Sequence, residues 1–206
     1  MNIVVCMDSF KGSLAANEAV NYVAKGLRAQ GLNSELIEIP IADGGEGSAD
    51  IVHAALGGER ISCCVTGPLP MMKMDVTFIQ LPDNSVLVEL ASVAGLTLLS
   101  KEQRQPMLTT TYGVGEVLKE VLKLKPPLIR LALGGSATND GGMGAACALG
   151  YRFLDASGKE LRGCGDSLKL ITSIVEPENL HLVPFEILSD VNNPLCGERG
   201  AARVFG

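Results

Sequence analysis

The chain has 206 residues, 47% of them hydrophobic and only 4% aromatic, and a formal net charge of -6 at pH 7. This length allows one large domain or two small ones, with an aliphatic core typical of helices packed on a mostly parallel sheet. The acidic balance, with no basic cluster to offset it, argues against nucleic acid as a partner. No stretch approaches the length of a membrane span, so we expect no membrane partner either.

Cysteine and histidine usage gives no sign of disulfides or bound zinc. Six cysteines are scattered without a Cys-x-x-Cys pair, and His53 and His181 have no metal-ligand spacing with them. The apolar start of the chain is too short for a signal-peptide core and meets Asp8 and Lys11 at once. We therefore expect a reduced, cytoplasmic chain.

A β-α-β unit is predicted at the start of the chain. Residues 2–7 are typical of a buried strand, apolar positions between Val20 and Leu27 predict a helix that stops at Gly31, and residues 36–39 predict a second strand. A right-handed parallel connection is the default for such a unit. The loops that follow parallel strands gather at one edge of the sheet, where ligands bind.

Charged residues stand beside glycines in both of these loops. Asp8 and Lys11 follow the first strand, and Asp43 to Ser48 follow the second strand, ahead of a helix that stops at Gly57. Lys11 could be an ordinary surface lysine, and Asp43 a turn residue or helix cap. Because the pattern occurs after two consecutive strands, we favour a functional interpretation.

The middle of the chain changes character. Short strands separated by Gly-Pro and Pro-Asp-Asn turns are predicted at residues 61–65, 74–79 and 86–90. Gly67 to Pro70 is predicted to link two lobes, so we divide the chain into residues 1–66 and 67–206. A small-residue turn at residues 91–96 either faces a ligand or packs closely.

A glycine-rich loop is the central feature. The strand predicted at residues 128–133 leads into the loop at residues 134–144 and then into a short helix that ends before Gly150. Bare backbone N–H groups and a helix N-terminus suit an anion. Asp140 would repel a bare phosphate, but it could orient a metal or a hydroxyl. The glycine spacing matches neither a Walker A loop nor a dinucleotide fingerprint, and a plain tight turn is the alternative.

Two further segments carry polar groups with two interpretations each. Thr109 to Thr111 open a predicted helix, where one threonine suffices as a cap and the others could bind substrate oxygens. The strand predicted at residues 185–189 delivers Asp190, which is either a cap or a catalytic base or metal ligand. Residues 151–154 with a turn at Ser157 predict a hairpin, and residues 164–168 predict a surface turn.

Four motifs, taken together, resemble the bacterial type I glycerate kinase family. They stand at residues 8–14, 42–47, 134–142 and 190–195. Thr110, Gly113, Gly115 and Glu116 fit a fifth motif, and Gly67 to Leu69 a sixth. The resemblance implies phosphorylation of D-glycerate with ATP and Mg²⁺, to 2-phosphoglycerate in most bacterial members. It also implies an α/β fold with two lobes, a Rossmann-like parallel-sheet lobe and a second mixed α/β lobe, with the site between them.

The sequence departs from the family pattern in three places. Cys6-Met7 replaces Ala-Pro, with little expected effect, and Ala15 replaces a capping Ser or Thr, which would cost about 1 kcal/mol. Family members also continue well past Gly206. Alternatives are therefore an inactive, truncated fragment or ligand-binding remnant, or a kinase for another small hydroxy acid. A homo-oligomer, or a partner chain that supplies the missing C-terminal half, also stays open.

The shared position after strands leads to specific roles for these residues. Asp190 is predicted to accept the proton of the attacking hydroxyl, and Lys11 to neutralise the transferred phosphoryl group or the carboxylate. Asp8 and Asp43 are alternative bases or Mg²⁺ ligands. Asp190 and Asp43 are the predicted metal ligands. The predicted substrate- and phosphate-binding residues are Ser9, Asp43, Gly44, Gly45, Glu46, Gly134, Gly135, Ser136, Thr138, Asn139, Asp140, Gly141 and Asn193.

Overall fold

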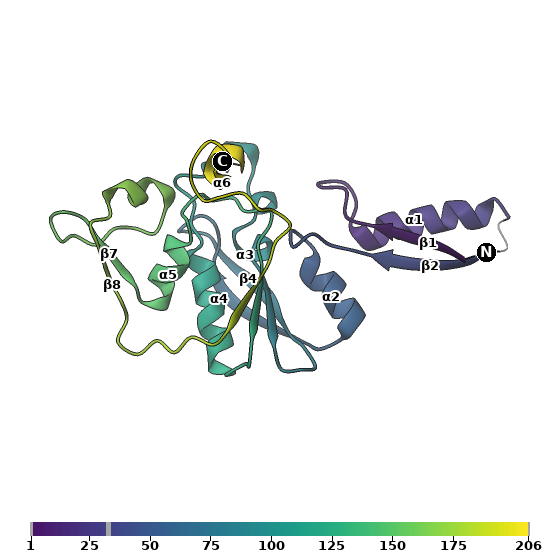
Figure 1. The fold of residues 1–206 in the computed structure, drawn as a ribbon, viewed down its shortest axis with the longest axis horizontal. Helices are drawn as coiled ribbons and strands as arrows, with labels where there is room; N and C mark the ends of the chain where they lie inside the picture. Colours follow the sequence, from purple (N-terminus) through teal and green to yellow (C-terminus); the bar gives the residue numbers. More distant parts are fainter. Residues whose placement is uncertain (1, 32–33, 206) are drawn as a thin grey trace.

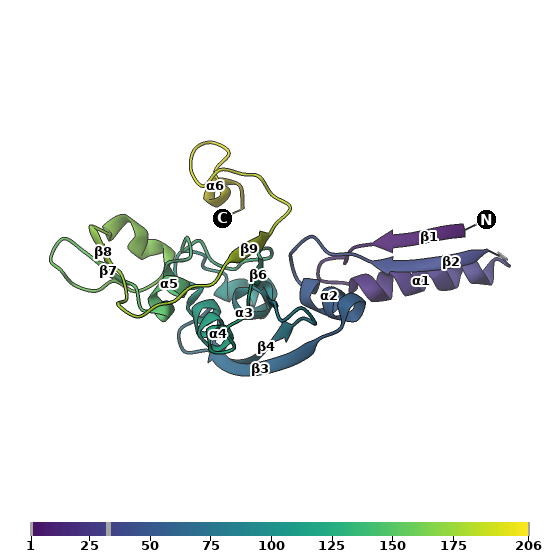
Figure 2. The ribbon, with the colours of Figure 1, turned by 60° about the horizontal axis from the view of Figure 1, so that its bottom comes forward.

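The computed structural model describes residues 2–31 and 34–205 and has an elongated shape (Figure 1). Strands β1 (Asn2–Met7) and β2 (Glu35–Pro40) pair in parallel, and α1 (Ala16–Ala29) connects them. This predicted β-α-β unit projects from the rest of the molecule in both ribbon views (Figure 2). The α/β class expected from the sequence is confirmed.

The N-terminal unit is covered on one face only. Helix α1 buries a stripe of small and aliphatic side chains against the two strands, including Ala19 and Val20. Val5 is buried as predicted for β1, whereas Val4 and Ile37 are exposed. The reason is that strand side chains alternate between faces, and α1 shields only one of them in the described part of the chain.

A second sheet has five strands in the order β3-β4-β5-β6-β9. Their bounds are β3 (Glu59–Thr66), β4 (Lys73–Gln80), β5 (Val86–Glu89), β6 (Ile129–Ala132) and β9 (Phe185–Leu188). Strands β3 and β4 form an antiparallel hairpin, whereas β5, β6 and β9 run parallel. The Gly67–Pro70 segment, predicted to link two lobes, is the turn of this hairpin. The predicted division at residue 66 therefore falls between two paired strands.

Helices cover both faces of the five-stranded sheet. Val86 and Val88 of β5 point to the face covered by α4 (Tyr112–Lys123), whose Val114, Val117 and Val121 are fully buried there. Leu87 points to the opposite face, where α2 (Ser48–Leu56) packs. This alternation is what a strand buried on both sides requires.

The remaining elements are short. They are helices α3 (Ala91–Ala94), α5 (Met143–Leu149) and α6 (Ala201–Phe205), strands β7 (Arg152–Leu154) and β8 (Ser173–Val175), and the 3-10 helices η1 (Leu96–Leu98), η2 (Lys101–Gln103) and η3 (Gly165–Leu170). Strand β7 pairs with β8 and also, across the predicted turn, with residues 159–161, through one antiparallel bridge from Leu154 to Glu160. The Asp155 carboxylate closes that turn by accepting the N–H groups of Ser157 and Lys159.

Residues 164–168 are less exposed than the predicted surface turn, since Cys164, Gly165 and Ser167 are buried. None of the described helices combines the length and the apolar character needed to cross a membrane.

Candidate functional site

The carboxyl ends of the three parallel strands lie side by side. In the strand register, Glu89 of β5 is paired with Ala132 of β6, and Ala132 is paired with Leu188 of β9. The loops that leave these strands start at neighbouring points on one sheet edge. Such an edge is where open α/β sheets bind their ligands.

The loop between β2 and α2 lies on this same edge. A Cβ atom on Gly134 would lie 2.6 Å from the Cα atom of Gly45, so the two glycine-rich loops are in direct backbone contact. A Cβ atom on Gly44 would lie 2.7 Å from the carbonyl oxygen of Leu188, and Gly44 has a φ of 92°. The structure therefore brings together two predicted loops that are about ninety positions apart, a contact that only glycine permits.

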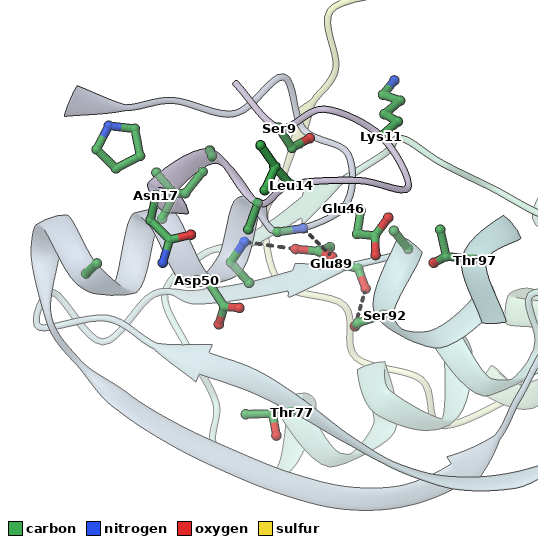
Figure 3. Close-up of a pocket in the computed structure, with 18 of the residues that line it drawn as sticks. Ser9, Lys11, Leu14, Asn17, Glu46, Asp50, Thr77, Glu89, Ser92 and Thr97 are labelled. Carbon is green, nitrogen blue, oxygen red and sulfur yellow. Dashed lines mark hydrogen bonds between the residues drawn. The ribbon is translucent and has the colours of Figure 1, made fainter. Parts of the chain in front are cut away.

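A cavity of about 720 Å³ opens beside this contact. Its walls come from the loop after β1, the start of α1, the start of α2, strands β3 and β4, the end of β5, and α3 with η1 (Figure 3). Of the predicted residues, Ser9, Lys11 and Glu46 line it. Its charged lining groups are Lys11, Arg60, Glu46, Asp50, Asp75 and Glu89.

Lys11 and Asp43 form an ion pair at the rim. Their charged atoms are 3.7 Å apart, and the Lys11 side chain is 80% exposed, so the pair adds little to stability. The other oxygen of Asp43 accepts the N–H of Gly45 at 2.8 Å, which holds the turn of the loop. Asp43 thus shapes the loop, while the exposed Lys11 side chain extends outward (Figure 3).

The start of the central loop has open backbone donors. Among the described residues, the N–H groups of Gly134, Gly135 and Ser136 have no hydrogen-bond acceptor. The other side of the loop is anchored, because Gly135 accepts the N–H of Leu96 and Ala137 donates its N–H to Ala94. Gly135 has a φ of 63°. Successive free amides in such a turn are suited to an anion.

Asp140 faces the protein interior rather than the cavity. Its side chain is buried, with 1% of the residue exposed. Oδ2 accepts the N–H and the hydroxyl of Thr111 at 2.7 and 2.8 Å and the N–H of Gly144 at 3.1 Å, and Oδ1 accepts the N–H of Gly142 at 3.0 Å. The carboxylate thereby fastens the central loop and the start of α5 to α4.

The predicted threonines make the same kind of connection. The hydroxyls of Thr109 and Thr110 donate to the carbonyls of Ala137 and Gly163. The hydroxyl of Thr138 donates to the carbonyl of Thr109 at 2.9 Å. All three threonines are buried and bonded within the protein. These bonds join the central loop to the segment before α4, and the Thr110 hydroxyl also accepts the N–H of Tyr112, the first residue of α4, at 3.1 Å.

The other predicted residues lie outside the cavity lining. Asp8 is half-buried and accepts the N–H of Ser9, and Asp190 is exposed two residues after β9 ends. Asn193 donates its amide to the Arg199 carbonyl at 2.9 Å, and Asn139 is half-buried. Within residues 2–31 and 34–205, no group of three or more His, Cys, Asp or Glu side chains is arranged to hold a metal.

Glu89 is a cavity residue that the sequence analysis missed. Its carboxylate is buried and accepts the N–H groups of Gly47 at 3.1 Å and Ala49 at 2.9 Å. Burial raises the pKa of Glu89; the two N–H bonds oppose this change, and the carboxylates of Asp50 and Glu46 add to it. The available signal was a single charged residue at the end of an otherwise apolar strand.

Comparison with known proteins places this geometry in a family. The model of the glycerate kinase family matches residues 3–206. The chain is 39% identical over 210 residues to a glycerate kinase of Haemophilus influenzae and 37% identical to a glycerate 2-kinase of Escherichia coli. These alignments cover 100% of this chain and 55% of each relative, so the chain spans about half the length of the curated relatives it matches.

A solved structure agrees with this result. A crystal structure from Salmonella typhimurium LT2, assigned as a glycerate kinase 2, superposes with a TM-score of 0.78 at 36% sequence identity. The match covers 100% of this chain and 56% of that one. Sequence and fold thus point to the same group over the full 206 residues, and the chain belongs to the glycerate kinase family.

Proposed function

We propose that this chain phosphorylates D-glycerate with ATP to give 2-phosphoglycerate. The observation that carries the proposal is the contact of the two glycine-rich loops at the carboxyl edge of β5, β6 and β9. That contact sets the open amides of residues 134–136 near a cavity bordered by Lys11 and Glu46. Relatives named as glycerate kinases support the reaction class and the substrate.

The open amides of Gly134 to Ser136 are the proposed anion site. They would bind either a phosphate of ATP or the carboxylate of glycerate, through donors that are fixed before the ligand arrives. Lys11, exposed at the rim, would turn toward the transferred phosphoryl group and offset its negative charge. These contacts would position the substrates and neutralise the charge of the phosphoryl group, which is the main task of a protein in phosphoryl transfer.

Proton removal is assigned to Asp190. The attacking hydroxyl of glycerate would give its proton to this carboxylate as its oxygen bonds to the γ-phosphorus, and ADP would leave. Asp190 is exposed and stands just past the end of β9, next to the loop that contacts Gly44. Asp8 is the alternative base. Ser9, Glu46 and Asn193 would orient the substrate hydroxyls.

Asp43 and Asp190 are the residues that would hold a magnesium ion arriving with ATP. Mg²⁺ keeps several waters and is commonly held by one or two carboxylates together with substrate phosphates, rather than by an all-protein cage. When bound, the ion would neutralise phosphate charge.

The test is an assay of phosphate transfer to D-glycerate with ATP and Mg²⁺. The 206-residue chain is assayed beside a chimera that adds the remainder of the Escherichia coli glycerate 2-kinase. We expect turnover by the chain or the chimera, and its loss in Lys11→Met. Lys119→Met, on the exposed side of α4, is the matched control and should keep turnover.

Phosphorylation of another hydroxy acid in place of glycerate would overturn the substrate. Absence of transfer in both proteins would overturn the reaction. Turnover by the chimera alone would show that the residues named here form one part of a larger site.

A further inference from the structure

Glu89 holds the beginning of α2 with a buried negative charge. The residue is 5% exposed, and its two carboxylate oxygens accept the N–H groups of Gly47 and Ala49 (Figure 3). Gly47 is the N-cap residue of α2, and Ala49 lies in its first turn. These amides form the positive end of the helix dipole, where an anion is stabilised.

We propose that Glu89 is an internal anion that occupies the N-terminus of α2, keeps phosphate and carboxylate ligands away from it, and leaves the amides of residues 134–136 to bind the anionic group. The identity of that group rests on the proposed function. The exclusion by Glu89 does not rest on it, since it follows from contacts within the chain. Glu89 is in this account a positioning residue.

The neighbouring charged side chains also disfavour an anionic ligand at the N-terminus of α2. Glu46 precedes Gly47, and Asp50 lies in the first turn of α2, so three carboxylates surround this helix end. Of the two cations at the cavity, Arg60 is paired with Asp50 at 2.8 Å and Lys11 with Asp43 at 3.7 Å. An incoming phosphate would meet the negative charges of Glu46 and Glu89, which form no ion pair with either cation within the described ranges of the chain.

The central loop, in contrast, has no protein carboxylate on its open amides among the described residues. Its one carboxylate, Asp140, is buried and its oxygens are bonded to donors of the protein interior. The amides of Gly134, Gly135 and Ser136 have no acceptor in the described part of the chain. Of two glycine-rich loops in contact with each other, one is thus already filled by a protein anion and the other is open.

Glu89 also holds the two loops in place. Its side chain connects the end of β5 to the start of α2, across 42 and 40 positions of sequence. The segment immediately before Gly47 includes Gly45, which touches Gly134. Loss of the carboxylate is therefore expected to change both the anion preference of the first loop and its position against the second.

The experiment is a titration of the 206-residue chain with inorganic phosphate, monitored by ¹H–¹⁵N spectra. In the wild type, phosphate should shift the amides of residues 134–136 and leave Gly47 and Ala49 unmoved. In Glu89→Ala, phosphate should bind at the freed amides and shift the signals of Gly47 and Ala49. Acetate should restore the wild-type positions of these two amide signals, because it replaces the missing carboxylate.

Asp50→Asn is the matched control. It removes one negative charge from the same helix turn but leaves the Glu89 bonds intact, so Gly47 and Ala49 should stay unresponsive to phosphate. Glu89→Gln keeps the shape of the side chain and serves if Glu89→Ala does not fold. In the wild type itself, the Gly47 and Ala49 signals should titrate together as the pH is lowered through the pKa of Glu89.

The proposal is overturned if phosphate shifts Gly47 and Ala49 in the wild type. It is also overturned if these signals do not titrate with Glu89, or if phosphate and acetate leave them unmoved in a folded Glu89→Ala. None of these results depends on turnover. A chain that binds phosphate as described but does not phosphorylate glycerate would reject the proposed function alone.

Discussion

Replacement of Asp140 by alanine is expected to destabilise the fold strongly. The substitution leaves three donors of buried residues without this acceptor, namely the N–H and hydroxyl of Thr111 and the N–H of Gly144, and it also frees the N–H of the exposed Gly142. An unsatisfied buried donor costs about 1–3 kcal/mol, and water that enters the vacated space repairs part of this loss. We therefore expect a loss of about 3–5 kcal/mol, a large part of the stability of a typical domain.

Asparagine at the same position should cost much less. Its single carbonyl oxygen can take the place of Oδ2 and accept the two Thr111 donors and Gly144. Its amide group would then face the N–H of Gly142, so about one hydrogen bond is lost, at ~1–2 kcal/mol. The expected order of stability is wild type, then Asp140→Asn, then Asp140→Ala.

Urea unfolding followed by circular dichroism measures these differences, with equal m values as the check that one transition is compared. Asp166→Ala, at an exposed position in η3, is the matched control and should lie within about 0.5 kcal/mol of the wild type. The reasoning is refuted if Asp140→Ala costs less than about 1 kcal/mol, or if the asparagine and alanine variants are equally stable. Loss of ligand binding without loss of stability would instead place Asp140 in contact with the ligand.

Three further predictions concern the loop contact, the buried glutamate and the proposed base. Gly134→Ala should push the two loops apart and abolish phosphate binding, because its Cβ would lie 2.6 Å from the Cα atom of Gly45. Its control is Gly26→Ala in α1, which has open space around it; this variant should bind phosphate as the wild type does and gain about 0.5–1 kcal/mol in free energy of unfolding. Because the folded-state pKa of Glu89 is raised, the wild type should lose free energy of unfolding as the pH rises from the ordinary value of 4.5 through that pKa, and denaturation at several pH values should show a flatter profile for Glu89→Gln. Asp190→Asn should lower kcat by orders of magnitude with an unchanged melting temperature, because Asp190 is exposed, and near-normal turnover would reject it as the base.

Much of the secondary structure follows from local sequence patterns. The apolar spacing between Val20 and Leu27 predicts α1, and the loops after β1 and β2 were expected at a ligand-binding edge. The course of Gly67–Pro70 was not predictable in the same way, because a linker and a hairpin turn share the same residues. Only the pairing of Thr66 with Lys73 distinguishes them, and pairing is a tertiary property.

The site was predictable in its location but not in its internal connections. The sequence placed both glycine-rich loops after strands, and the structure shows them in contact at Gly45 and Gly134. That Asp140 would turn inward, and that Glu89 would reach the start of α2, depends on contacts across 29 to 42 positions. Local sequence patterns do not indicate contacts between residues that far apart in the chain. The roles of Lys11, Asp190 and the other predicted site residues stay predictions.

The most direct measurement is transfer of radiolabelled phosphate from ATP to D-glycerate, in wild type and Lys11→Met, by the 206-residue chain and by the chimera. We expect labelled phosphoglycerate from at least one of the two proteins when Lys11 is present, and its loss in Lys11→Met with an unchanged melting temperature. Equal transfer by wild type and Lys11→Met would contradict the site described here. Transfer to neither glycerate nor any other hydroxy acid would contradict the assignment of a kinase to this chain.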